Sequence, residues 1–137
     1  TSVERLAFAD RKLAFDANAQ TTAKVLGAVF GREAVANRDY AAIGLQLLDG
    51  GTRYADLMKL ALDARLGANA SNDAVVTVLY TNVVGVAPGA AELATFTGLI
   101  AAGQYTQATL GVLAADTAQL ANAINLTGLA TSGLVYA

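Results

Sequence analysis

The chain has few residues of the types that act as nucleophiles, bases or metal ligands, and their spacing matches no known catalytic arrangement. The 137-residue chain contains no His and no Cys. It therefore cannot form a Ser-His-Asp or Cys-His arrangement, or an imidazole or thiolate metal site. Its serines have no neighbouring base that would activate a hydroxyl, and its three glutamates, Glu4, Glu33 and Glu92, are not paired for acid–base work on a glycoside. We therefore expect a protein that is not an enzyme.

Without His or Cys, the metal ligands that remain are carboxylate and amide oxygens, and the metal we consider for them is calcium. Asp10, Asp16 and Asn18 lie close together near the N-terminus, and Ca²⁺ binds several such oxygens within about a dozen residues. The segment is a degenerate version of a calcium loop, and a solvated acidic surface is the alternative interpretation. Asp10, Asp16 and Asn18 are thus the candidate calcium ligands, and we expect no other cofactor.

The charge pattern excludes one large class of partners. Nine Lys and Arg stand against eleven Asp and Glu, a formal net charge of −2, and no basic residue follows Arg65. Nucleic-acid binding needs a basic field, so we expect no nucleic-acid partner. We also expect no membrane span, because glycines and Pro88 interrupt the apolar stretches.

The surface is expected to be weakly charged. Hydrophobic residues make up 55% of the chain and charged residues only 15%. A soluble monomer usually carries a well-charged surface. Helix faces covered by Ala, Thr, Asn and Gln therefore favour packing against neighbouring molecules.

Hydrophobic periodicity predicts a mainly α fold that follows a short β-hairpin. The hairpin strands are expected at Val3–Phe8 and Lys12–Asp16, around a turn at Ala9–Arg11. A final strand at Leu134–Tyr136 could join them. About six helices lie between, and their expected first or capping residues are, in order, Thr21 or Thr22, Asn37, Thr52, Ser71 or Asn72, Ala90 and Thr106.

The helical part repeats itself. Sliding the sequence by 53 residues places Val25-Leu26 on Val78-Leu79, Gly50 on Gly103, Leu57 on Leu110 and Asp63 on Asp116, without a gap. One such unit cannot close its own core, so two degenerate repeats are expected to pack together. We expect a single domain over 1–137, with a β-hairpin at 1–18, helical repeats at 19–67 and 71–125, and a C-terminal tail at 126–137.

Roughly Val25–Asp116 resembles, as two degenerate copies, a bacterial module family, the "domain of unknown function 4214". The resemblance lies in Leu79-Tyr80, Asn82-Val83-Val84-Gly85 and Pro88, followed by Leu99–Gly103 and Tyr105–Asp116. The chain departs from the family pattern at Val86, Phe96 and Val35, where the family has Arg, Trp and Pro. The resemblance implies a protein that a Gram-negative bacterium exports by type I secretion, associated with RTX repeats and with the anchoring segments of surface layers. It implies a structural or adhesive role.

Four residues are candidates for contacts with other molecules. Tyr54 and Tyr105 each follow a glycine that ends a helix, and Leu134 and Tyr136 lie in the expected final strand. We expect a secreted, non-enzymatic module that self-associates into a surface layer or filament, or that binds other surface proteins. The alternatives are an anchor to outer-membrane polysaccharide, with or without calcium, and a C-terminal type I secretion module of a larger protein.

Overall fold

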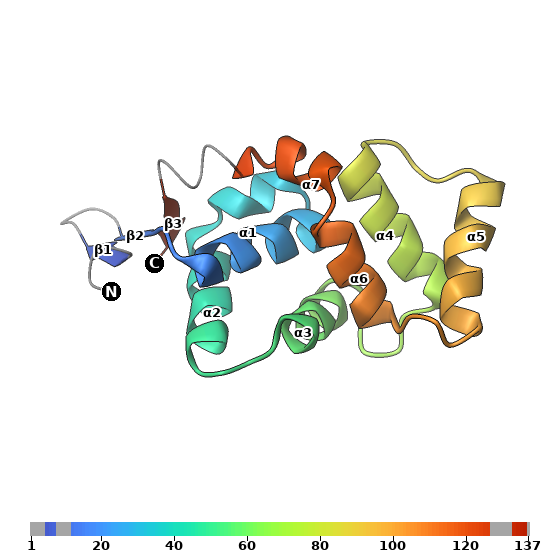
Figure 1. Ribbon diagram of the computed structural model, residues 1–137, viewed down its shortest axis with the longest axis horizontal. Coiled ribbons are helices and arrows are strands. Elements are labelled where there is room, and N and C mark those ends of the chain that lie inside the picture. The colour runs from blue at the N-terminus through green and yellow to red at the C-terminus, as the bar shows by residue number, and fades with distance from the viewer. Residues whose placement is uncertain (1–4, 8–11, 127–132, 137) are drawn as a thin grey trace.

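The computed structural model describes residues 5–7, 12–126 and 133–136. The fold is mainly helical, with the predicted N-terminal strand pair and C-terminal strand (Figure 1). In chain order the described elements are β1 (Arg5–Ala7), β2 (Lys12–Ala14), α1 (Ala17–Phe30), the 3₁₀ helix η2 (Arg32–Ala36), α2 (Arg38–Asp49), α3 (Tyr54–Leu66), α4 (Asn72–Val84), α5 (Ala90–Ala101), α6 (Gln107–Ala115), α7 (Ala118–Ala123) and β3 (Leu134–Tyr136).

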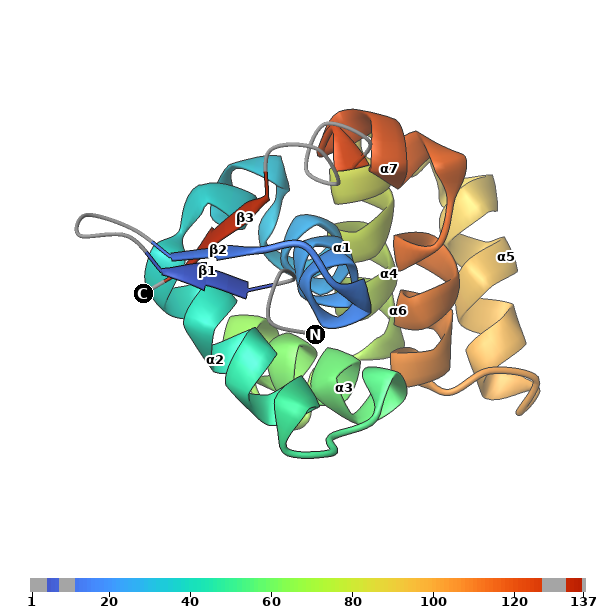
Figure 2. The same ribbon diagram turned by 60° about the vertical axis from the view of Figure 1, so that its left-hand side comes forward.

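The three strands form one antiparallel sheet with β2 in the middle. Leu13 of β2 lies opposite Leu6 of β1 and Val135 of β3. The final strand thus joins the hairpin as predicted, and β3 also packs on α2. The sheet brings strands from both ends of the sequence to one end of the molecule (Figure 2). The expected turn at 9–11 lies outside the described residues, as does most of the segment that follows Leu126.

The first helix begins earlier than the sequence predicted. The expected cap was Thr21 or Thr22, but α1 starts at Ala17, and the Asp16 carboxylate accepts a hydrogen bond of 3.1 Å from the Ala19 N–H. Asp is a better N-cap than Thr, and the Ala and Gln residues that follow are strong helix formers. Thr22 lies instead in the buried interior of α1.

Most other helix starts agree with the sequence, and the last helix is divided. Asn37, Ser71 and Thr106 cap α2, α4 and α6 with side-chain hydrogen bonds, as expected. The residue before α3 is Arg53 rather than Thr52, and it makes no side-chain cap. The predicted sixth helix breaks after α6 because the Thr117 hydroxyl accepts a hydrogen bond from the Leu120 N–H and starts α7.

Helix α1 is the centre of the core. It contacts α2, α3, α4, α6 and α7, and Val25, Leu26 and Val29 are almost fully buried. Gly27 allows α7 to approach closely, because a Cβ at this position would lie 2.5 Å from Ile124 Cγ2. Gly27 is therefore a site of close approach between α1 and the end of α7.

The two predicted repeats have matching elements, α1-α2-α3 and α4-α5-α6. Equivalent helices meet each other, since α1 packs on α4 and α3 on α6. Met58 and Gly111 are equivalent positions in this contact, where a Cβ at Gly111 would lie 2.6 Å from Met58 Cγ. Helices α2 and α5 also end in the same type of turn, with Gly51 at φ +103° and Gly103 at φ +81°, one residue out of the 53-residue register that pairs Gly103 with Gly50. The repeats are thus related by structure as well as by sequence.

Candidate functional site

Each repeat holds an apolar groove between its three helices, and equivalent positions line the two grooves. Groove 1 lies between α1, α2 and α3 and has a volume of about 190 Å³. Groove 2 lies between α4, α5 and α6 and has a volume of about 320 Å³. The pairs of equivalent lining residues include Leu26 and Leu79, Ile43 and Phe96, Leu57 and Leu110, Leu60 and Leu113, and Ala61 and Ala114. The same groove has therefore formed twice in one chain.

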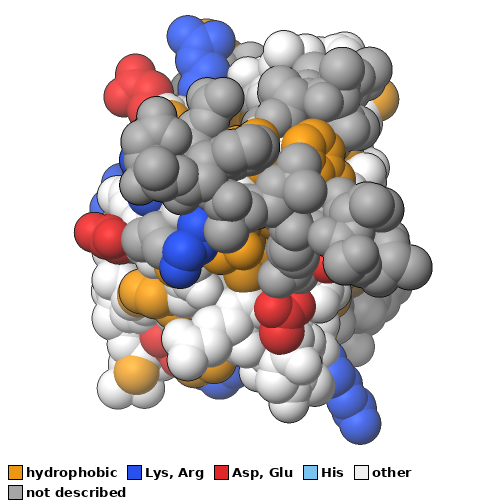
Figure 3. All heavy atoms as spheres, turned by 90° about the vertical axis from the view of Figure 1, so that its left-hand side faces the viewer, with side chains coloured by type: hydrophobic (Ala, Val, Ile, Leu, Met, Phe, Trp, Pro, Cys, Tyr) orange, Lys and Arg blue, Asp and Glu red, His pale blue; other side chains and the backbone are white. Residues whose placement is uncertain are grey.

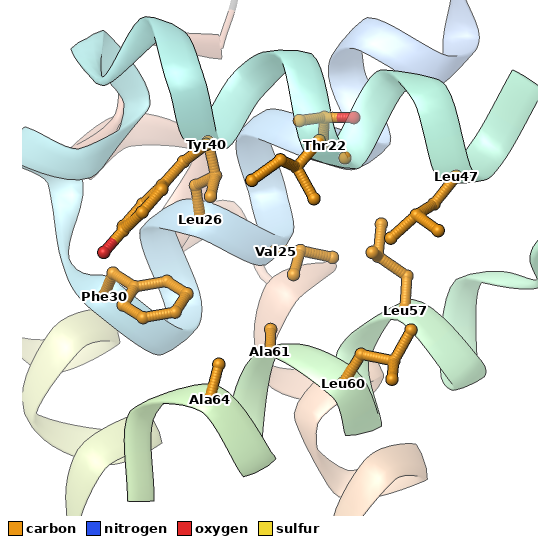
Figure 4. Close-up of a pocket in the computed structure, with 12 residues that line it drawn as sticks. Thr22, Val25, Leu26, Phe30, Tyr40, Leu47, Leu57, Leu60, Ala61 and Ala64 are labelled. Atoms are coloured by element: carbon orange, nitrogen blue, oxygen red, sulfur yellow. The ribbon is translucent and has the colours of Figure 1, made fainter.

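Groove 1 is closed at one end by two aromatic rings. The ring centroids of Phe30 and Tyr40 lie 5.1 Å apart with their planes at 47°, and both rings face the groove in Figure 4. Its rim is apolar and exposed, since Ile43 is 55% and Leu60 is 50% accessible. Groove 1 thus presents hydrocarbon to solvent.

Thr22 lines groove 1 with a buried side-chain hydroxyl that has no hydrogen-bond partner. Among the described residues, its Oγ1 is the only buried side-chain polar atom without a hydrogen-bond partner. Helix α2 covers it at Gly44, where a Cβ would lie 2.7 Å from Thr22 Cγ2. The equivalent residue in the second repeat is Val75, which is fully buried. Helix α2 therefore buries the Thr22 hydroxyl, and the burial of this unpartnered polar group opposes folding.

Groove 2 is more open because α5 packs mainly on α4. Figures 1 and 2 both show α5 at the outer edge of the helical body. None of its 12 residues is buried, although Glu92 is its only charged residue. The principal contact is between the Phe96 and Tyr80 rings, whose centroids are 6.3 Å apart. Nearby, Leu113 is 45% exposed.

A polar cluster joins the two repeats beside α6. The Tyr54 hydroxyl donates to Asp116 Oδ1 at 3.0 Å, and Lys24 Nζ lies 3.2 Å from the same oxygen. Burial raises the pKa of Tyr54 well above its ordinary value, and the hydrogen bond and negative charge of Asp116 add to this effect. The phenol therefore stays protonated and donates the hydrogen bond to Asp116.

Two of the three calcium candidates, Asp16 and Asn18, lie in the part of the chain that the structure describes, and both make other hydrogen bonds. The Asp16 carboxylate caps α1, and the Asn18 side-chain amide donates a hydrogen bond of 2.9 Å to Asp49 Oδ1. Asp10 lies outside the described residues. In the parts of the chain that the structure describes, no group of three or more acidic side chains is placed to hold an ion.

The four predicted contact residues have different environments. Tyr54 belongs to the polar cluster, and Tyr105 is half-buried between α5 and α6. Leu134 was predicted to face other molecules, but it is 1% exposed because β3 covers the core. Its side chain is thus unavailable for such a contact. Tyr136 is half-buried, with Lys12 Nζ 5.9 Å from its ring centroid.

The structure exposes three large apolar residues that the sequence analysis did not single out as candidates for contact. These are Ile43, Leu60 and Leu113. The repeat alignment pairs Leu60 with Leu113 and Ile43 with Phe96, so the sequence did mark these as recurring apolar positions.

The sheet end of the molecule has a different surface. In Figure 3, the described charged side chains of both signs are spread over this end, and the described apolar atoms form small separate patches.

Comparisons with protein-family models, with curated proteins and with solved structures find no match. Within the described ranges, every helix is too short or too polar to span a lipid bilayer. The fold and the site together define a mainly helical module with two equivalent apolar grooves.

Proposed function

We propose that this chain is a non-enzymatic structural module that acts by self-association, as a subunit of an extracellular layer or filament. The observation that carries the proposal is α5, an apolar helix in which no residue is buried. Apolar surface contributes roughly 25 cal/mol for each Å² that is removed from water. A partner that covers α5 would therefore gain free energy that the isolated chain does not obtain.

The weak charge of the second repeat supports the same proposal. Residues 71–125 contain Asp73, Glu92 and Asp116 and no Lys or Arg. A surface with few charges loses little hydration free energy when a second protein covers it. Interface cores are depleted in charged residues for this reason.

Several polar side chains that the structure describes make contacts that stabilise the fold. Asp16 caps a helix, and Asp116 binds Tyr54 and Lys24 across the two repeats. The raised pKa of Tyr54 keeps it from acting as a base near neutral pH. These roles favour a binding module over a catalyst.

The extracellular setting is proposed from the resemblance of Leu79–Pro88 and its surroundings to the secreted bacterial modules named above. In that setting the partners are further copies of the chain or other proteins of a Gram-negative cell surface. Calcium is not required for the contacts that carry the proposal, because these contacts are apolar.

Analytical ultracentrifugation tests the proposal directly. We expect the purified chain to form larger species as its concentration rises from micromolar towards millimolar, and electron microscopy to show layers or fibres. The association should persist at high salt, because the apolar part of the interface is weakly screened. A single monomeric species over the whole concentration range would contradict the proposal.

A further inference from the structure

We propose that self-association is head-to-tail, with the groove 2 side of one copy packed on the groove 1 side of the next. This inference rests on the proposed function and adds its geometry. The first face consists of Tyr40, Ile43 and Leu60, on α2 and α3. The second face consists of Val84, Val86 and Leu113, together with α5.

The first face is a compact apolar surface on the outside of the first repeat. Tyr40 is 42%, Ile43 is 55% and Leu60 is 50% exposed. All three line groove 1, so the exposed side chains surround one shallow hollow rather than lying as isolated residues. A face of this kind is unusual on a monomer and typical of an interaction site.

The second face lies on the other repeat. Val84 is 40%, Val86 is 64% and Leu113 is 45% exposed, and α5 adds a helix without a single buried residue. Val84 and Leu113 line groove 2. In Figure 1, α2 and α5 lie in opposite halves of the long axis. The two faces therefore share no helix, and one copy can offer both.

Charge favours contact between unlike faces. The first repeat, residues 19–67, holds six Lys and Arg against five Asp and Glu, a net charge of +1. The second repeat, residues 71–125, holds three acidic residues and no basic residue, a net charge of −3. Two second repeats in contact would place carboxylates together without a compensating cation, whereas a first repeat supplies cations such as the exposed Arg65.

This pairing predicts an open polymer. When a face binds a different face, each added copy leaves one of each kind free at the ends. Growth then continues unless the rotation between copies closes a ring. A face that binds itself would instead stop at a dimer.

Two single variants test the geometry by blocking one face each. Ile43→Glu places a carboxylate on the first face, and Leu113→Glu places one on the second. Both positions are about half exposed, so folding should be retained, and circular dichroism will check this. The matched controls add the same charge to exposed residues outside both grooves, Gln46→Glu on α2 and Thr77→Glu on α4. The controls should polymerise like the unmodified chain.

We expect each blocked variant alone to be monomeric, with association weakened by at least about tenfold because a carboxylate must be buried. A mixture of Ile43→Glu and Leu113→Glu should give a 1:1 dimer that grows no further, because each partner supplies the face that the other lacks. Sedimentation velocity and light scattering measure both results.

Three results would overturn the inference while leaving self-association intact. They are a dimer of Ile43→Glu alone, a mixture that remains monomeric although the unmodified chain polymerises, and full polymerisation of both variants. A monomeric unmodified chain would instead contradict the proposed function itself.

Discussion

Tyr54 at the start of α3 donates a 3.0 Å hydrogen bond to Asp116 at the end of α6, across a sequence separation of 62 residues. Lys24 of α1 contacts the same carboxylate. The hydrogen bond from Tyr54 to Asp116 therefore connects the first repeat to the second at the edge of the α3–α6 contact. Each repeat alone would lack one partner of this cluster.

The first prediction concerns the stability of the folded chain at alkaline pH. The pKa of Tyr54 is raised in the folded state, so the unfolded chain loses this proton first as the pH rises past the ordinary value of about 10. The stabilisation is present below that pH and is lost progressively above it, by at most about 1.4 kcal/mol per pH unit. Partial exposure of the ring reduces the pKa shift, and with it the total stability that is lost.

Urea unfolding of Tyr54→Phe between about pH 9 and pH 11 measures this effect. Stability should fall less steeply with pH in this variant than in the unmodified chain. Asp116→Asn should give an intermediate slope, because burial of the phenol remains when the charge is removed. Equal slopes in all three proteins would contradict the assignment.

The second prediction is that removing the orphaned Thr22 hydroxyl stabilises the fold. Thr22→Val replaces a buried polar atom without a partner by a methyl group of similar size, so we expect a gain of about 1 kcal/mol in the free energy of unfolding. The matched control is the reverse change at the equivalent site, Val75→Thr, which should destabilise by roughly 1–3 kcal/mol. Chemical denaturation measures both values, and a loss of stability in Thr22→Val would show that the hydroxyl has a partner.

The third prediction compares two helical glycines. A Cβ at Gly111 would lie 2.6 Å from Met58 Cγ, whereas a Cβ at Gly98 meets nothing within 4 Å. Gly111→Ala should therefore cost about 1–3 kcal/mol, because the α3–α6 contact must open. Gly98→Ala should stabilise α5 by about 0.5–1 kcal/mol through helix propensity.

Thermal melts at low protein concentration keep self-association from affecting this comparison. The prediction fails if the two variants change stability in the same direction. Such a result would mean that Met58 moves away at little cost.

The fourth prediction concerns the local stability of α5. A helix without buried residues opens at low free-energy cost, so in dilute solution the α5 amides should exchange with deuterium much faster than those of α1. At high concentration, a partner that covers α5 should slow its exchange selectively. Hydrogen–deuterium exchange at two concentrations tests both points. Equal protection of α5 and α1 in dilute solution would contradict the first, and an unchanged α5 rate at high concentration would contradict the second.

Features that depend on a few neighbouring residues followed from the sequence. The caps at Asn37, Ser71 and Thr106 were predicted because a capping side chain binds a backbone N–H only two or three residues away. The mainly α fold, the strand pair and the final strand followed from hydrophobic periodicity. The cap of α1 was misplaced because Asp16, Thr21 and Thr22 all have suitable side chains.

Burial and long-range pairing were decided by the tertiary structure. Periodicity shows which side of a helix is apolar, but not whether another element covers that side. Ile43 and Leu113 lie on the apolar sides of their helices but stay exposed in the structure, whereas Leu134, named as a contact candidate, is buried in the core. The bond between Tyr54 and Asp116 also depends on how α3 meets α6. Sequence therefore determined the helices and their repeat, while packing in three dimensions decided which apolar faces remain open to a partner.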